Sequence, residues 1–319
     1  MHFLSMLVLM LALPLQSQHI WSVSAVDEHG ALWKKQNQSF HGHKNILKMW
    51  KQRKTGVFFL HKNAKPYSIR AEAVGANLFS KMKIPVPNTH INLENSRHPS
   101  LMIEFYSGLK RPSSLDYKKN DKVLLRAFLL DLLLYNYDRH RLNIRVQKSG
   151  ELLFFDHGAG LTSKAQGGSL DYSEIVDFDQ VKKVMTLAVN KKRPVNLGYA
   201  GWVDWQRLRK GELKFSNPEE VRKALEEFQT VLTDDVICED ILKPVFSTLS
   251  LDESRAEISK RLSSLKNIFL SVASRDEARA RKTFHKILDD YNGNQWCYFS
   301  KTMASRRDQI VKIVTAALP

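Results

Sequence analysis

The chain has 319 residues, of which 43% are hydrophobic and 26% are charged, and this balance excludes the disordered and fibrous classes. The length suffices for one large two-lobed domain or for two ordinary domains. The formal charge of +16 indicates an anionic partner: nucleic acid, an anionic membrane face or a phosphorylated small molecule. Nucleic acid is disfavoured, because the basic residues form no arginine-rich tail and no interleaved aromatic motif.

The N-terminus carries an apolar run from Phe3 to Leu15, followed by small residues that end at Ala25. This pattern predicts a signal peptide over residues 1–25 and an exported protein. The start lacks Lys and Arg, so a misassigned start or a buried strand is the alternative, and an uncleaved protein would be cytoplasmic. No later stretch approaches 18 consecutive apolar residues, so we expect a soluble or peripherally membrane-bound protein.

The first half of the chain predicts a small mixed lobe. The apolar run Gly56–Lys62 is typical of a strand. Helical spacing of apolar residues then predicts a helix over Ile69–Met82, which Pro85 helps to end. Two further strands are expected at His90–Leu93 and Leu101–Tyr106.

The second half predicts a mainly helical lobe. Val123–Tyr135 is apolar nearly all round, which indicates a buried helix. Two short strands, Asn143–Val146 and Glu151–Phe155, flank a turn, and Leu161–Leu170 is typical of a loop. Apolar spacing predicts four later helices, the first of them with Asn217 as N-cap: Val221–Leu232, Leu251–Ser274, Asp276–Tyr291 and Lys301–Leu318.

Two short connections hold most of the groups that can handle a metal or a proton. Asp138 lies five residues before Asn143, a spacing that lets a loop aim a carboxylate at an acceptor hydroxyl and an amide oxygen at magnesium. Asp156 follows an apolar strand and precedes His157 and Gly158, where its carboxylate can reach a second metal position. Mg²⁺ needs few protein ligands because it keeps several waters.

The strings DRHxxN at 138–143 and FDHG at 155–158 resemble the catalytic and metal-binding loops of the phosphatidylinositol 3-/4-kinases. They are also similar to those of HipA-type kinases and secretory-pathway Golgi kinases. The resemblance implies that Asp138, Arg139 and His140 are catalytic. Asp138 would be the catalytic aspartate, and His140 would orient the loop or assist near the phosphate. It also implies that Asn143 and Asp156 are the metal ligands.

The same resemblance extends upstream and implies a nucleotide site. The strand before the first helix would carry the phosphate-binding lysine, either Lys62 or, because it precedes a proline as in many such kinases, Lys65. Glu72 on the helix would pair with that lysine. The segment around Glu104 resembles the hinge strand whose backbone holds adenine. No glycine-rich phosphate loop is recognisable before this strand.

Together these patterns predict an α+β, bilobed, protein-kinase-like fold, with a small mixed N-lobe over 33–109 and a mainly helical C-lobe over 110–319 that includes a C-terminal helical extension. ATP and Mg²⁺ are expected between the lobes. The expected reaction transfers the γ-phosphoryl group to a hydroxyl, with a phosphoinositide lipid favoured over Ser/Thr of a protein, as in HipA-like or secretory kinases.

Other interpretations remain open at this stage. The chain can be a pseudokinase or a module that binds an anionic partner without turnover. Asp138 and Asp156 can be an N-cap and a turn residue, and Glu72 can be a solvated helix residue. The basic stretch Lys182–Arg193 is either a solvated face or a contact for an anionic lipid head group or an inositol phosphate. His140 and His157 lack a third ligand for a zinc site.

Overall fold

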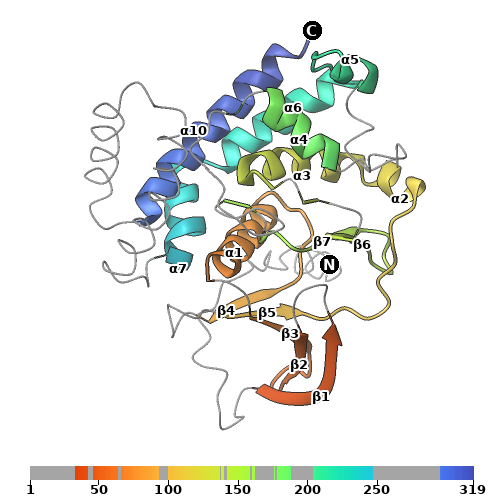
Figure 1. The fold of residues 1–319 in the computed structure, drawn as a ribbon, viewed down its shortest axis with the longest axis vertical. Coiled ribbons are helices and arrows are strands. Elements are labelled where there is room, and N and C mark those ends of the chain that lie inside the picture. The colour runs from red at the N-terminus through yellow and green to blue at the C-terminus, as the bar shows by residue number, and fades with distance from the viewer. Residues whose placement is uncertain are drawn as a thin grey trace, which may run out of the picture.

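The structure is a computed structural model, and it describes residues 33–41, 46–63, 66–92, 100–136, 138–139, 142–158, 160–161, 176, 178–187, 204–246 and 295–319. The described elements form two lobes, a sheet with one helix against it and a larger group of helices (Figure 1). The α+β class and the bilobed arrangement expected from the sequence are therefore confirmed. Within these residues, no helix combines the length and the hydropathy needed to cross a bilayer.

The small lobe is built on a five-stranded sheet in the order β1-β2-β3-β5-β4, and all neighbouring strands are antiparallel. Its strands are β1 Trp33–His41, β2 Ile46–Gln52, β3 Phe58–Asn63, β4 Thr89–Asn92 and β5 Ser100–Glu104. β3 lies in the middle, with both edges paired, and Lys62 faces Leu101 of β5 in the register. The central strand thus holds this lysine in a constrained position.

Helix α1, Pro66–Lys81, joins the two lobes. It begins with proline, which is favoured at the first helical position because its missing N–H is not needed there. It packs against β4 and β5 and also against helices of the large lobe. Its buried side chains include Ile69, Val74, Leu78 and Phe79. A helix covered on most sides in this way is held in one place, and it carries Glu72.

The large lobe surrounds one buried helix. Its helices are α2 Ser114–Lys119, α3 Asp121–Leu134, α4 Phe178–Leu187, α5 Trp205–Arg209, α6 Pro218–Val231, the π-helix η2 Val236–Leu242, α7 Lys243–Phe246 and α10 Gln295–Ala316. From Leu124 to Leu134 nearly every side chain of α3 is buried, as its apolar sequence predicts. Helices α1, α4, α6 and α10 contact it.

A short hairpin brings the chain from α3 to the junction of the lobes. Strands β6 Ile144–Val146 and β7 Leu152–Phe154 are antiparallel. The N–H of Phe154 donates to the carbonyl of Pro85, 3.0 Å away, which ties β7 to the segment that leaves α1. The segment 155–158 follows β7, and its last residue, Gly158, contacts α1.

The elements predicted in the described residues are confirmed, with shifts of a few residues at their ends. Asn217 caps α6, as expected, by accepting a hydrogen bond from the N–H of Glu220. Strands β1 and β2 were not predicted, because their sequences are rich in Lys and Gln, which strands disfavour. The signal peptide, the loop 161–170 beyond its first residue and the helices predicted at 251–274 and 276–291 lie outside the described residues.

Candidate active site

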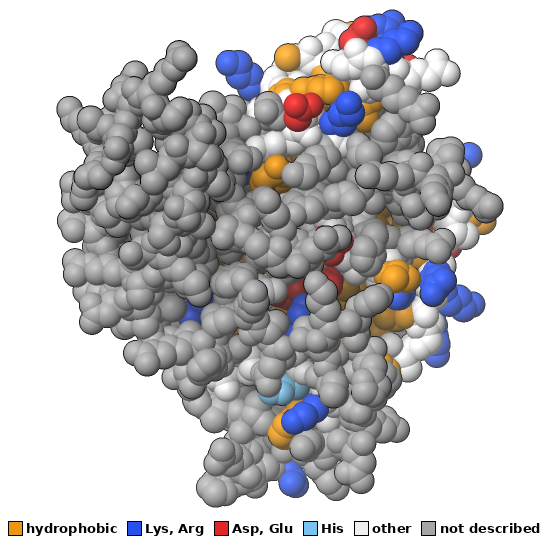
Figure 2. Space-filling view, viewed as in Figure 1, with side chains coloured by type: hydrophobic (Ala, Val, Ile, Leu, Met, Phe, Trp, Pro, Cys, Tyr) orange, Lys and Arg blue, Asp and Glu red, His pale blue; other side chains and the backbone are white. Residues whose placement is uncertain are grey.

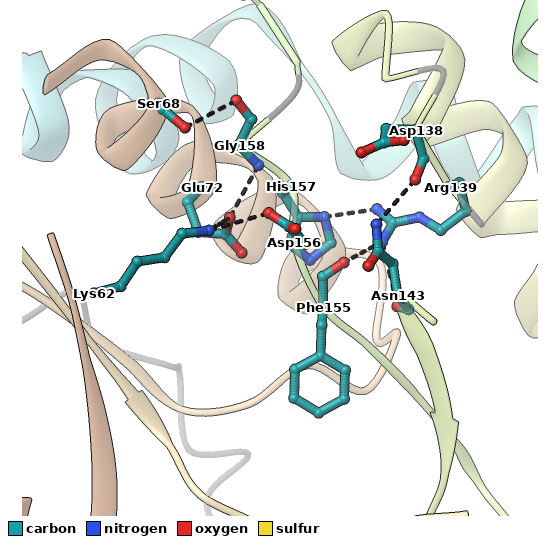
Figure 3. Close-up of polar contacts among 10 residues, drawn as sticks. All are labelled: Lys62, Ser68, Glu72, Asp138, Arg139, Asn143, Phe155, Asp156, His157 and Gly158. Carbon is teal, nitrogen blue, oxygen red and sulfur yellow. Dashed lines mark hydrogen bonds and ion pairs between the residues drawn. The ribbon is translucent and has the colours of Figure 1, made fainter. Parts of the chain in front are cut away.

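Lys62 is held between two carboxylates that come from different lobes (Figure 3). Its Nζ lies 3.1 Å from Oε2 of Glu72 on α1 and 3.0 Å from Oδ1 of Asp156, just after β7. The side chains of Lys62 and Glu72 are 14% and 5% exposed, whereas that of Asp156 is 50% exposed. The pair predicted between Glu72 and a strand-borne lysine is therefore present, and Lys62 forms it.

Both partners of the buried pair are held in their charged forms. Burial acts to lower the pKa of Lys62, but the carboxylates of Glu72 and Asp156 outweigh it and raise this pKa above its ordinary value. Burial likewise acts to raise the pKa of Glu72, and Lys62 together with a backbone N–H outweighs it, so that this pKa is lowered. A fixed ammonium group thus lies where the two lobes meet.

The segment Asp156–Gly158 is fastened to α1. The N–H of Gly158 donates to Oε2 of Glu72 at 2.9 Å, and Oγ of Ser68 donates to the carbonyl of Gly158 at 3.2 Å. A Cβ at position 158 would lie 2.7 Å from Oγ of Ser68, so glycine is needed for this close approach. Asp156 has a positive φ of 55°, a conformation that non-glycine residues adopt rarely and that turns its carboxylate out of the strand direction.

The loop after α3 meets the same segment through a chain of hydrogen bonds. Nδ2 of Asn143 donates to the carbonyl of Asp138 at 2.9 Å, and the N–H of Asp138 donates to Oδ1 of Asn136 at 3.1 Å. The N–H of Phe155 then donates to the carbonyl of Asn143 at 2.9 Å. These bonds place the backbones of Asp138 and Asn143 next to Phe155, the residue before Asp156 (Figure 3), and the shared role of the three residues in one site stays a prediction.

Arg139 does not have the catalytic position that we expected for it. Its side chain is 0% exposed, so it cannot touch a substrate. The guanidinium forms an ion pair with Asp131 of α3 at 3.0 Å and also donates to the carbonyl of Phe155. Arg139 is therefore a positioning residue and not a catalytic one: in the protein interior it connects α3, its own loop and the end of β7.

His157 completes this interior network in its neutral form. Its side chain is buried, and Nδ1 lies 2.9 Å from Nη2 of Arg139, so Nδ1 accepts and the ring carries its proton on Nε2. Burial, and then the charge of Arg139, lower the pKa of His157 well below its ordinary value. The ring packs against Phe79, with 4.4 Å between ring centroids. A Cβ at Gly75 would lie only 2.3 Å from the Cβ of His157.

The oxygen atoms around Asp156 suit a hard divalent cation. Because the amide nitrogen of Asn143 is used in its bond to Asp138, the amide oxygen is the atom left for a metal. A half-exposed carboxylate and an amide oxygen are hard ligands of the kind that Mg²⁺ prefers when phosphates and water fill the other positions. No group of three His, Cys, Asp or Glu in the described parts of the chain is arranged to hold a metal by itself.

The other predicted site residues are only partly placed. His140 and Lys65 lie outside the described residues. Glu104 ends β5, where its N–H donates to the carbonyl of Asn88 at 2.8 Å and its carboxylate accepts from Oη of Tyr106 at 3.1 Å. Its predicted contact with adenine stays a prediction.

Two residues of the site were missed in the sequence. Asp131 had a signal, because a carboxylate in an otherwise apolar, buried helix needs a charged partner. Ser68 had none, because a serine in the first turns of a helix is common on any surface.

Figure 2 shows one face of the molecule, on which charged side chains of both signs are visible. Described Asp and Glu side chains lie near the middle of this face with Lys or Arg beside them, and further acidic and basic side chains lie at the top.

The chain is similar to several solved structures of other proteins. No protein-family model matches the chain, and no curated protein matches it. It is similar to the Helicobacter pylori proinflammatory kinase CtkA, with a TM-score of 0.45 and 13% identity over 89% of this chain and 95% of that one.

The N-terminal 618-residue fragment of LepB from Legionella pneumophila has a TM-score of 0.45 and 10% identity over 82% of this chain and 46% of that one. The Cydia pomonella granulovirus kinase PK-1 has a TM-score of 0.35 and 14% identity over 62% of this chain and 79% of that one. TM-scores below 0.5 decide nothing about activity. The chain's own architecture, in which a lysine on β3 pairs with a glutamate on α1 between a small sheet and a helical lobe, makes the fold kinase-like.

Proposed function

We propose that this protein is a phosphotransferase that moves the γ-phosphoryl group of ATP to a hydroxyl group. The observation that carries the proposal is the position of Lys62, held in its charged form by Glu72 and Asp156. Phosphoryl transfer needs positive charge and exact placement more than covalent help from the protein. The site supplies a fixed cation beside a carboxylate and an amide that suit a metal.

Each residue has a part that follows from its position. Lys62 binds phosphate oxygens, and Glu72 keeps its ammonium group in place. Asp156 and Asn143 would hold Mg²⁺, which when bound neutralises charge on the phosphates. Asp138 would accept the proton of the acceptor hydroxyl. Its backbone is fixed on both sides, by Asn136 and Asn143.

The acceptor is proposed from the sequence rather than from the geometry. The order Asp-Arg-His at 138–140 and the formal charge of +16 favour an anionic lipid such as a phosphoinositide. A Ser or Thr of a protein is the alternative. Both acceptors present a hydroxyl, so the same carboxylate of Asp138 would serve either reaction.

The test is an assay with radiolabelled ATP, Mg²⁺ and the full chain, run in parallel on phosphoinositide-containing vesicles and on a mixture of protein acceptors. Label in lipid alone supports the lipid kinase, and label in protein alone supports the protein kinase. Asp138→Asn is the control, and it should abolish either signal. Binding of Mg·ATP without any transfer would indicate that the protein is a pseudokinase and not an enzyme.

A further inference from the structure

A buried arginine of the C-terminal helix holds the end of α3. Arg306 of α10 is 1% exposed, and its Nη2 donates to the carbonyl of Leu132 at 2.9 Å, while its Nε donates to that of Leu133 at 3.3 Å. The guanidinium also lies over the ring of Tyr135, 5.2 Å from the centroid. Nη2 further donates to Oε1 of Gln180 on α4 at 3.1 Å. One side chain thus connects three helices.

These bonds complete the C-terminus of α3. The last four carbonyls of a helix have no partner inside it. In α3 the carbonyl of Asp131 accepts from the N–H of Asn136 at 2.8 Å, and that of Leu134 accepts from the N–H of Leu161 at 2.8 Å. Arg306 donates a hydrogen bond to the carbonyl of Leu133, and the carbonyl of Leu132 accepts from both Arg306 and the N–H of Tyr135. A cation at this end is also favoured by the helix dipole.

The same face of α10 reaches the chain beyond the site. Oε1 of Gln309 accepts a hydrogen bond from the N–H of Val176 at 2.7 Å, and Nε2 of Gln309 is itself held by Oγ of Ser305 at 3.0 Å. Figure 1 shows α10 lying beside the helices of the large lobe, and it contacts α3, α6, α7 and η2. The helix therefore touches both the segment before Asp138 and a residue downstream of Gly158.

We propose that α10 is a clamp for the catalytic loop and that Arg306 is a positioning residue for Asp138. The loop begins where α3 ends, at the left-handed residue Tyr135, and only two residues separate Tyr135 from Asp138. Fixing the last carbonyls of α3 fixes the direction in which the loop leaves. The expected effect on kcat rests on the proposed phosphotransfer. The expected effect on the order of the loop does not.

The chain offers a matched control on the next residue. Arg307 is also an arginine of α10 with little exposure, 13% for its side chain. Its Nη1 donates to the carbonyl of Leu232 at 2.7 Å and pairs with Asp234 at 2.8 Å, which ties α10 to the end of α6. Removing Arg307 therefore weakens the attachment of α10 without touching α3.

The experiment compares Arg306→Gln, Arg306→Lys and Arg307→Gln in the full chain, at a temperature where thermal unfolding shows all three folded. Hydrogen exchange is followed in the peptide that spans residues 135–146, and kcat and KM for ATP are measured in the transfer assay. Arg306→Ala with added methylguanidinium tests whether the missing group can be restored in the cavity.

Faster exchange in this peptide for Arg306→Gln and Arg306→Lys but not for Arg307→Gln supports the clamp. So does a fall of about 10²-fold in kcat with little change in KM, because a small misplacement of a catalytic group has effects of this size. Recovery of activity with methylguanidinium supports it too. Equal effects of Arg306→Gln and Arg307→Gln would overturn it. If the wild type transfers no phosphate, the proposed function fails, while the exchange data still decide the clamp.

Discussion

Arg139 and Asp131 form an ion pair from which water is excluded: Nε and Nη2 of the arginine each lie 3.0 Å from one carboxylate oxygen, and both side chains are 0% exposed. The pair links the last turn of α3 to the loop that carries Asp138. Because the same guanidinium reaches the carbonyl of Phe155 and Nδ1 of His157, one charge orders both connections of the site.

We predict that Arg139→Met lowers the free energy of unfolding by about 3–5 kcal/mol, because it leaves the carboxylate of Asp131 buried and uncompensated. Urea unfolding measures the change. The double variant Asp131→Asn/Arg139→Met should recover part of the loss. Arg222→Met, which breaks an exposed pair with Glu219, should change stability by less than about 1 kcal/mol. Equal losses for Arg139→Met and Arg222→Met would refute the interior role.

Gly75→Ala should destabilise the protein and reduce activity. In an ordinary helix this change stabilises by about 1 kcal/mol, since alanine is the better helix former. Here the new Cβ would lie 2.3 Å from the Cβ of His157, so α1 must move away from the segment Asp156–Gly158 and carry Glu72 away from Lys62. Thermal unfolding shows whether Gly75→Ala lowers or raises the melting temperature. A raised melting temperature would show that the two segments are not in contact.

Stability should fall as the pH is lowered below the ordinary His pKa of 6.5, and His157 should account for part of the fall. Its folded-state pKa is lowered, so below pH 6.5 the unfolded chain binds the proton first, and stability is lost down to the folded-state pKa. The slope for one proton is at most about 1.4 kcal/mol per pH unit. His61 and His90 also have lowered pKa values, so the contribution of His157 is found by comparing the wild type with His157→Gln. The free energy of unfolding of this variant should fall less steeply as the pH is lowered.

Lys62→Met should weaken ATP binding and also destabilise the fold, because Glu72 remains buried without its cation. The double variant Lys62→Met/Glu72→Gln should regain stability but not ATP affinity. Calorimetric titration with Mg·ATP and urea unfolding separate the two effects. Lys65→Met serves as the comparison for the choice between the two lysines. An unchanged ATP affinity in Lys62→Met, with loss in Lys65→Met, would reverse the assignment.

Much of the fold followed from hydrophobic patterning, because α1 and α6 have apolar residues at helical spacing and α3 is apolar nearly all round. β1 and β2 did not, since Lys and Gln interrupt their apolar residues, and the pairing of β1 with β2 and of β2 with β3 decides their state. Such pairing depends on the neighbouring strand and leaves little trace in the residues of the strand itself.

The candidate site, like the fold, was only partly predictable from the sequence. The sequence pattern placed Asp138 soon after α3, Asn143 just before β6 and Asp156 soon after β7, and their shared role in a site stays a prediction. The pattern did not separate Lys62 from Lys65, since that choice depends on which residue of β3 faces Glu72. Nor did it place Arg139, because a cation beside a catalytic aspartate can face a substrate or the interior. The partner that decides this, Asp131, lies on the preceding helix.

The most direct test of the metal and base assignments is Mg·ATP titration together with phosphate transfer in Asp138→Asn and Asp156→Asn. We expect Asp138→Asn to bind Mg·ATP as the wild type does but to lose transfer by about 10²–10⁴-fold, the contribution of a general base. Asp156→Asn should lose the Mg²⁺ dependence of ATP binding. Full transfer activity in Asp138→Asn, or Mg²⁺-dependent binding of wild-type strength in Asp156→Asn, would contradict the account.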